Sequence, residues 1–226
     1  MSDATTTSPF LTLHGFWRSS ATFRVRVALR LKGLQFEERS ISIETGEHRG
    51  AEYLAINPQG ALPALTIPGH PPLIQSLAIL EFLDELAPSP AILPADPFDR
   101  AWVRSLSAIL CSDTHPLITP RIFGYIRENM DADTAAWRAW QTHWFHTGLA
   151  AFERCLAKDK RPGEFCLGNQ VGMADICLAS LFAVMDVLKI DPPADLPIAS
   201  HILANTYALP AFRESYPFNQ PGAPAG

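Results

Sequence analysis

A proline-rich stretch, Pro88-Ser89-Pro90-Ala91-Ile92-Leu93-Pro94, separates two parts of the chain that have different residue patterns. Proline lacks a backbone N–H and fixes φ, so this stretch is predicted to be neither a helix nor a central strand. Before it, short apolar runs alternate with helical spacing, whereas after it only helical spacing remains. The sequence therefore predicts an α/β domain followed by an all-helical domain.

The first part is predicted to fold as βαβ, a short helix and then ββα. A βαβ unit requires a parallel strand pair with a right-handed crossover, and Pro68-Gly69-His70 supplies a hairpin turn. The expected elements are 10–13, 20–32, 36–43, 49–55, 65–67, 73–74 and 76–86, then helices at 100–114, 121–130, 133–156, 173–188 and 198–207. The predicted domains are 9–87, a linker 88–97, a helical domain 98–218 and a Pro-, Gly- and Ala-rich tail 219–226 that is expected to fray.

Charge and composition exclude several classes of protein. The 226 residues carry 18 Lys and Arg against 23 Asp and Glu, and this net charge of −5 argues against a nucleic-acid partner. No apolar run reaches the length of a membrane span, and Met1 to Pro9 contain no apolar signal-peptide core. We therefore expect a cytoplasmic protein with no membrane partner.

Neither the histidines nor the cysteines show the spacing of a metal site, so no metal is expected. The cysteines stand in apolar surroundings and are predicted to be buried small hydrophobic residues. They are Cys111, Cys155, Cys166 and Cys177.

Two adjacent hydroxyl residues, Ser19 and Ser20, stand where the first apolar run gives way to a helical pattern. A serine there caps the helix by accepting a hydrogen bond from a free backbone N–H. The same N–H groups and the helix dipole favour an anion, and they lower the pKa of a thiolate held there. The segment is therefore either an ordinary capped helix or an anion site flanked by Arg18 and Arg24. A serine-hydrolase site is disfavoured because no G-x-S-x-G surrounds either serine.

A second motif is Leu62-Pro63, which follows Gly60 and directly precedes an expected strand. A cis proline at this position leaves the backbone of Leu62 free to pair with a peptide-like ligand, as in the addition of a strand to a sheet. The alternative interpretation is an ordinary loop proline.

A third motif is Gln75-Ser76, at the step from the last expected strand into a helix. It places a hydroxyl, an amide side chain and helix N–H groups where a carboxylate can bind. The alternative is a helix capped by Ser76 beside a solvated glutamine.

Taken together, the three motifs resemble the N-terminal, thioredoxin-like domain of glutathione transferases, and most closely the zeta class, which includes the maleylacetoacetate and maleylpyruvate isomerases. The class pattern S-S-C-x-W-R-V-R-I-A-L is similar to Ser19–Leu29, N-P-x-x-x-V-P-x-L to Asn57–Leu65, and Q-S-L-A-I-x-E-[YF]-L to Gln75–Leu83. In the helical part, Cys111–Leu117 resembles C-x-D-I-H-P-L and Met173–Leu178 resembles M-A-D-I-C-L. The resemblance covers nearly the whole chain and implies the glutathione transferase fold and a homodimer.

The resemblance also implies glutathione as the cofactor. Ser19 is implied to donate a hydrogen bond to the glutathione sulfur, and His48 to contact the glycine end. Leu62 is implied to pair through its backbone with the cysteinyl part. The implied cofactor-binding residues are Ser19, Ser20, Arg24, His48, Leu62, Pro63, Gln75, Ser76 and His115.

The implied activity is glutathione-dependent cis–trans isomerisation of a maleyl-type keto dicarboxylate in aromatic compound catabolism. Ser19 and Ser20 would stabilise the thiolate, and Arg18 and Arg121 would hold the carboxylates of a small electrophilic substrate. His115 and Arg121 would border the second-substrate pocket or the partner subunit. Two alternatives stay open: a glutathione S-transferase or dehalogenase acting on small electrophiles such as α-halo acids, and a non-catalytic glutathione-binding module.

Three positions depart from the class pattern. Ala21 stands where the class has a cysteine, which removes a thiol but not the neighbouring hydroxyl. Thr119-Pro120 replaces an Asn-Leu pair, and the proline removes a donor N–H. Gly172 replaces a threonine that would form a capping box with the Asp of Met-Ala-Asp, so the side-chain bond of the cap is lost.

Overall fold

A computed structural model describes residues 10–224. They form two compact units: the chain up to Pro90 together with the segment from Glu214 onward, and Ala91–Arg213. The predicted fold class, an α/β domain of the βαβ-ββα type followed by an all-helical domain, is confirmed. The predicted start of the first domain at residue 9, and residues 225 and 226 of the predicted tail, lie outside the described residues.

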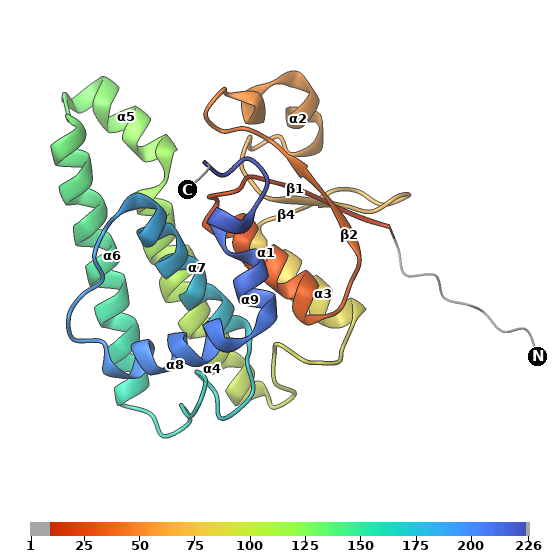
Figure 1. Ribbon diagram of the computed structural model, residues 1–226, viewed down its shortest axis with the longest axis vertical. Coiled ribbons are helices and arrows are strands. Elements are labelled where there is room, and N and C mark those ends of the chain that lie inside the picture. The colour runs from red at the N-terminus through yellow and green to blue at the C-terminus, as the bar shows by residue number, and fades with distance from the viewer. Residues whose placement is uncertain (1–9, 225–226) are drawn as a thin grey trace, which may run out of the picture. The chain divides into compact units, whose positions relative to one another are not determined.

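In the described part of the first unit, four strands form one mixed sheet in the order β2-β1-β3-β4 (Figure 1). β1 runs parallel to β2, as the predicted crossover requires, and β3 runs antiparallel to both β1 and β4. Helices α1 and α3 lie side by side on one face of the sheet, and α2 lies on the other (Figure 1). The elements are β1 (Leu11–Gly15), α1 (Ser20–Leu31), β2 (Phe36–Ser40), a 3-10 turn η1 (Glu47–Arg49), α2 (Ala51–Ile56), β3 (Ala64–Thr66), β4 (Leu73–Ile74) and α3 (Ser76–Leu86).

Helix α1 is buried over most of its surface, because the sheet, α3 and the end of the chain all pack near it. Every residue from Ser20 to Leu29 is buried, although the expected apolar face comprised only Phe23, Val27 and Leu31. Burial of apolar surface stabilises the fold by about 25 cal/mol per Å². The first turn of α1 is therefore anchored in the core of the unit, which fixes the position of the loop that enters it.

The segment from Glu214 packs against the first unit through Arg26. This guanidinium is fully buried, and it donates two hydrogen bonds to the Glu38 carboxylate, at 2.8 and 2.5 Å. A third N–H of Arg26 reaches the backbone carbonyl of Ser215 at 3.3 Å. The prediction placed residues 98–218 together in the helical domain, and the structure differs because these contacts tie Ser215 to α1.

The following residues also pack on the first unit. The rings of Trp17 and Phe218 lie 5.8 Å apart, and the buried Gln220 side chain donates to the backbone carbonyls of Glu214 and Tyr216. The expectation of a fraying tail from residue 219 therefore does not describe its first residues, since Gln220 is enclosed and hydrogen-bonded.

Helices make up most of the second unit, as predicted. The predicted helix 100–114 is interrupted, because a π-helical turn replaces its second half. A short final helix, α9 (Pro210–Ser215), was not predicted. The elements are α4 (Pro97–Ala108), the π-helical turn η2 (Ile109–Thr114), the 3-10 turn η3 (His115–Ile118), α5 (Pro120–Met130), α6 (Thr134–Ala157), α7 (Met173–Leu188), α8 (Pro197–Ala208), α9 and, in the first unit again, the 3-10 turn η4 (Pro217–Asn219).

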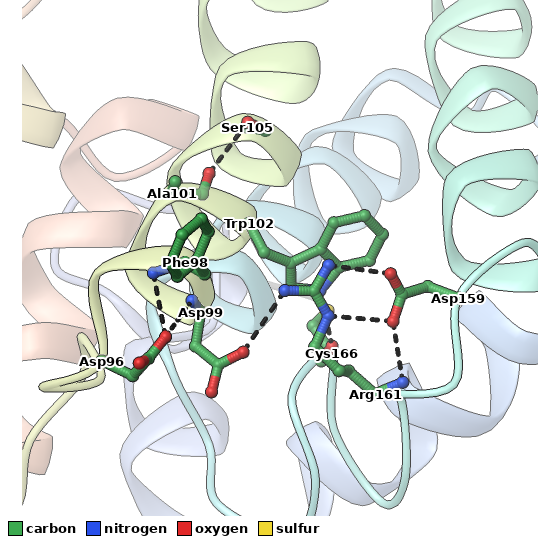
Figure 2. Close-up of polar contacts among 9 residues, drawn as sticks. All are labelled: Asp96, Phe98, Asp99, Ala101, Trp102, Ser105, Asp159, Arg161 and Cys166. Atoms are coloured by element: carbon green, nitrogen blue, oxygen red, sulfur yellow. Dashed lines mark hydrogen bonds and ion pairs between the residues drawn. The ribbon is translucent and has the colours of Figure 1, made fainter.

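A polar cluster joins the start of α4 to the loop after α6 (Figure 2). The Arg161 guanidinium lies over the Trp102 ring, 4.4 Å from its centre, and binds the Asp159 carboxylate at 2.9 and 2.8 Å and Asp99 at 3.3 Å. Hydrogen bonds from Arg161 hold the pKa of the Asp159 carboxyl down at about 2. The Trp102 indole N–H donates to the Cys166 carbonyl at 3.3 Å. The charges of Arg161, Asp159 and Asp99 thus have partners within the cluster, and we assign the cluster a structural role in holding the loop after α6 against α4.

No helix within residues 10–224 combines the length and apolar character needed to cross a membrane.

Candidate functional site

Ser19 occupies the N-cap of α1, as predicted. Its backbone is extended, and its side-chain oxygen accepts a hydrogen bond from the Thr22 backbone N–H at 3.2 Å. A hydroxyl has one proton to donate and two lone pairs, so capping uses an acceptor position and leaves the proton available. Ser19 is half-buried and can therefore present an oriented donor to a ligand at the positive end of the helix.

Ser20, the first residue of α1, has a hydroxyl with no partner. Its Oγ is buried and makes no hydrogen bond with any described residue, and the side chain is only 4% exposed. An unsatisfied buried hydroxyl is unfavourable by about 1–3 kcal/mol. Its position beside Ser19 places a second hydroxyl at the start of the helix. Ala21, which stands where the class has cysteine, is also buried.

The loop before Ser19 is held by close packing between β1 and α1. A Cβ on Gly15 would lie 2.3 Å from the Thr22 methyl group, so only glycine allows this approach. The Thr22 hydroxyl in turn accepts the Phe16 backbone N–H at 3.3 Å. At the edge of this loop, Arg18 pairs with Glu44 at 3.1 Å and remains about one-third exposed.

The bond between Leu62 and Pro63 is cis, as predicted. Strand β3 begins at Ala64, so the backbone of Leu62 lies just outside the hydrogen-bonded ladder. This is the position required for pairing with a peptide-like ligand.

The predicted N-cap of α3 was Ser76, and the structure places the N-cap one residue earlier, at Gln75. Gln75 is the N-cap and has φ 68° and ψ 112°, a conformation that L-residues rarely adopt, whereas Ser76 is the first helical residue. The Ser76 hydroxyl accepts a hydrogen bond from Arg24 Nε at 3.0 Å. Arg24 is only 2% exposed, so the structure connects it to the candidate site through Ser76. Backbone strain of this kind is found at ligand-binding positions and is unfavourable by about 1–3 kcal/mol.

His48 is the middle residue of the short η1 turn and is half-buried. Its Nδ1 atom is buried and has no hydrogen-bond partner among the described residues. Like Ser20, it is a polar group that the folded chain leaves unsatisfied, which is consistent with the ligand contact that the resemblance implies.

The candidate residues of the first unit are joined by contacts. Arg24 connects α1 to Ser76 at the start of α3, and Gln75 Nε2 donates to Gln59 Oε1 at 2.9 Å in the loop that leads to Leu62. The predicted residues from three separate stretches of sequence thus lie in one connected region of the first unit.

The second unit carries the other two candidates, His115 and Arg121. His115 is half-buried at the start of η3, directly after the π-helical turn η2, and Arg121 is exposed in the first turn of α5. From α6, the Trp140 indole donates to the Leu117 carbonyl at 2.7 Å and Gln141 donates to Ile118 at 3.4 Å, which holds the η3 turn in place. π-Helical turns occur often at functional sites.

The Thr119-Pro120 departure is compatible with the local fold. Pro120 is the first residue of α5, where the missing N–H is one that a helix leaves unpaired in any case. The Thr119 hydroxyl donates to the Pro116 carbonyl at 3.0 Å and does not cap the helix.

Three residues that the sequence interpretation did not select support the site: Tyr53, Asn57 and Gln59. All lie in α2 or within three residues of its end. The side chains of Tyr53 and Asn57 donate to the Ala61 carbonyl next to Leu62, and the side chain of Gln59 accepts a hydrogen bond from Gln75. The Asn-Pro pair before a glycine was the available signal, since asparagine commonly bonds to nearby backbone in turns.

The cysteine prediction is only half right. Cys166 and Cys177 are buried, whereas Cys111 and Cys155 are partly exposed because they lie on the less covered sides of η2 and α6. Within residues 10–224, no group of three or more His, Cys, Asp or Glu is arranged to hold a metal ion.

Comparison with known proteins agrees with this geometry. The family model "Glutathione S-transferase, N-terminal domain" matches residues 18–86, and "Glutathione S-transferase, C-terminal domain" matches residues 134–217. Both halves of that architecture are therefore present in order, and the first match includes the Ser19, Leu62 and Gln75 regions.

Individual relatives extend over nearly the whole chain. A probable maleylacetoacetate isomerase of Vibrio cholerae serotype O1 is 36% identical over 94% of this chain and 98% of the relative. A maleylacetoacetate isomerase of Methylobacterium extorquens AM1, solved with malonate and glutathione bound, is 41% identical with a TM-score of 0.91, over 95% of this chain and 100% of that one. A maleylpyruvate isomerase described as a bacterial zeta-class glutathione S-transferase is 38% identical with a TM-score of 0.90, over 94% of this chain and 100% of that one.

The chain therefore belongs to the glutathione S-transferase family, within the zeta-class group of maleylacetoacetate and maleylpyruvate isomerases.

Proposed function

We propose that this protein is a glutathione-dependent isomerase that converts a maleyl-type keto dicarboxylate from the cis to the trans form. The observation that carries the proposal is the start of α1, where Ser19 presents a free hydroxyl proton beside the unsatisfied Ser20 hydroxyl. The names of the relatives, which align with nearly the whole chain, supply the substrate class.

The residues of the first unit fit glutathione. The tripeptide has an anionic sulfur, a peptide backbone and charged ends. The unit provides a donor-rich helix start, the Leu62 backbone just outside strand β3 and the strained Gln75-Ser76 step. Two buried polar atoms, Ser20 Oγ and His48 Nδ1, have no hydrogen-bond partner within residues 10–224 and can be satisfied by a ligand. Glutathione, when bound, supplies a thiol that adds to the cis double bond, permits rotation about the resulting single bond and leaves again.

The part played by Ser19 follows from electrostatics. Its O–H donates to the sulfur anion while its oxygen remains fixed by the Thr22 N–H. The dipole of α1 adds a positive potential at the same point. Each unit by which this environment lowers the thiol pKa corresponds to about 1.4 kcal/mol of preference for the thiolate.

Arg18 and Arg121 are proposed to hold the substrate carboxylates and the enolate that develops during reaction. Arg18 uses one nitrogen for Glu44, and a guanidinium has five donor hydrogens, so further donors remain for a ligand. Arg121 is exposed in the first turn of α5. Donors aimed at developing charge are a large source of rate enhancement in enzymes.

We also propose that the protein is a cytoplasmic homodimer, with domain limits close to 9–87 and 98–218 apart from the returning C-terminal segment. The family resemblance supports the dimer, and the sequence composition supports the location.

Parallel assays test the proposed reaction. We expect turnover of maleylacetoacetate or maleylpyruvate only when glutathione is added, with no net consumption of glutathione, because the thiol is released in each cycle. Consumption of glutathione with a halo acid, and no isomerisation, would instead indicate a transferase or dehalogenase. Glutathione binding by calorimetry without turnover of any of these compounds would indicate a binding module.

A further inference from the structure

Asn57 is a buried amide at the end of α2, and only 1% of its surface is exposed. Its Nδ2 donates to the Ala61 backbone carbonyl at 2.6 Å, and its Oδ1 accepts the Gln59 backbone N–H at 3.0 Å. Both functions of the amide are therefore used within the next four residues of the chain.

The Ala61 carbonyl is held from two sides. Besides Asn57, the Tyr53 hydroxyl donates to it at 2.7 Å, so both lone pairs of this oxygen have a donor. Tyr53 is also buried, and burial raises the pKa of its hydroxyl to about 12, which keeps it protonated as a donor. The oxygen consequently has a fixed direction.

Fixing this oxygen also fixes the N–H of Leu62. The peptide between Ala61 and Leu62 is not among the cis bonds, and in a planar trans peptide the C=O and N–H point in opposite directions. Because the carbonyl points toward the buried donors, the Leu62 N–H points away from them.

The residue that the Asn57 side-chain oxygen binds, Gln59, is in turn bonded to the start of α3. Gln59, whose N–H is bound by Asn57, accepts a hydrogen bond from the side chain of the strained Gln75 at 2.9 Å. The turn also brings Gly60, at φ 61°, so close to the His48 carbonyl that a Cβ would lie 3.1 Å from it. The turn built on Asn57 thus contacts the segments that carry Leu62, Gln75 and His48.

We propose that Asn57 is a positioning residue that aims the Leu62 N–H at the cysteinyl part of glutathione and, through Gln59, steadies Gln75. The inference rests on the proposed function, because it takes glutathione as the ligand of the Leu62 backbone. Asn57 would thus act without contacting the ligand, by setting the geometry of two groups that bind it, the Leu62 N–H and Gln75.

The test compares Asn57→Asp with Asn57→Ala and Tyr53→Phe. The Asn57→Asp side chain keeps the acceptor for Gln59, but when ionised it cannot donate to Ala61. We expect glutathione binding at pH 8 to be weakened about tenfold in Asn57→Asp and at least as much in Asn57→Ala. Tyr53→Phe, which leaves the Asn57 donor in place, should have a smaller effect. Calorimetry gives the affinities, and melting temperatures identify any general loss of structure.

Acidification separates positioning from a general structural role. When the introduced carboxyl becomes protonated it regains a donor for Ala61, so the affinity of Asn57→Asp relative to wild type should recover as the pH falls from 8 to 5. The ratio for Asn57→Ala should stay constant. Nearby titratable groups are Tyr53, His48 and His14, which packs near Tyr53 and faces Arg39 and Glu37. They are common to all three proteins and cancel in the ratio.

A ligand-free measurement keeps the two proposals distinct. The amide signal of Leu62 in NMR spectra should shift in Asn57→Asp at pH 8 and return toward the wild-type position on acidification. If wild-type protein binds no glutathione, the proposed function fails, and this signal still decides the positioning role. An unchanged Leu62 signal, or equal glutathione affinity in wild type and Asn57→Asp at pH 8, overturns the inference.

Discussion

The starts of α1 and α7 both have backbone N–H groups bound by a side-chain oxygen, but the two capping groups differ in charge and exposure. Each helix leaves backbone N–H groups without partners, and each places a side-chain oxygen on them. At α1 the oxygen belongs to the neutral, half-buried Ser19 and accepts the Thr22 N–H. At α7 it belongs to the buried carboxylate of Asp175, which accepts the Gly172 N–H at 2.7 Å and the Cys166 N–H at 2.8 Å.

The difference lies in what remains after capping. Asp175 is 1% exposed, its two oxygens are both occupied, and an ionised carboxylate has no proton to give. Ser19 keeps a donor, and Ser20 beside it has an unsatisfied hydroxyl. A helix start can therefore serve structure or ligand binding, according to whether the capping group leaves a donor accessible.

Replacing Ser19 is expected to have the largest effect. Loss of one donor to a developing or resident anion lowers turnover by about a hundred- to a thousandfold. Ser19→Ala should lower turnover by this factor. It should also raise the pH at which the thiolate absorbance of bound glutathione appears. Loss of the cap should lower the free energy of unfolding by only about 1 kcal/mol. Ser19→Thr, which keeps a hydroxyl, is the matched control, and unchanged turnover in Ser19→Ala would refute the role of the hydroxyl.

At α7 the expected effect is on stability and depends on pH. Burial raises the pKa of the Asp175 carboxyl from 3.8 to about 6, against the opposing hydrogen bonds from Cys166 and Gly172. The folded protein therefore holds this proton more tightly than the unfolded chain does. The resulting stabilisation is complete below pH 4 and is lost as the pH rises through 6, by about 3 kcal/mol in total.

Denaturant unfolding of wild type and Asp175→Asn from pH 4 to 7 measures this contribution. The stability of wild type relative to the variant should decline over that range, because asparagine does not titrate. A constant difference would show that the carboxyl is ionised throughout. Ser19 has no titrating group and should give no such dependence.

The smallest effect is expected for Ser20→Ala. Whether this change raises or lowers the free energy of unfolding decides whether the Ser20 hydroxyl has a partner in the free protein. Ser20→Ala removes a buried hydroxyl that has no partner in the part of the chain that the structure describes, so without ligand the free energy of unfolding should rise by about 1 kcal/mol. If the hydroxyl binds glutathione, the same change should weaken binding, to an extent measured by calorimetry. A loss of stability in the free protein would mean that the hydroxyl already has a partner, and the contrast with Asp175 would disappear.

Local sequence signals predicted much of this arrangement. The helix cap at Ser19 and the cis bond before Pro63 each depend on residue types with strong backbone preferences. The predicted cap of α3, Ser76, was wrong by one residue, because the N-cap is Gln75. Gln75 has a positive φ, which glutamine rarely adopts. Propensity favours serine at a cap, and the tertiary bond from Arg24 to Ser76 outweighs it.

Two features could not be predicted from local signals. The two donors on Ala61 depend on side-chain conformations of Tyr53 and Asn57 that follow from packing. The return of the C-terminal segment depends on contacts such as Arg26 with Ser215, 189 residues apart. A composition rich in Pro, Gly and Ala suggests fraying, and the hydrogen bonds of the buried Gln220 side chain, which hold the first residues of the tail, cannot be inferred from that composition.

The contact between Arg26 and Ser215 bears on how the protein is made. Translation proceeds from the N-terminus, and domains that emerge first generally fold first. The first unit, however, acquires the Ser215 carbonyl and the ring of Phe218 only after the second unit, which precedes both residues in the sequence, has been synthesised. Of the two units, the one whose residues mostly come first in the sequence is thus the one completed second.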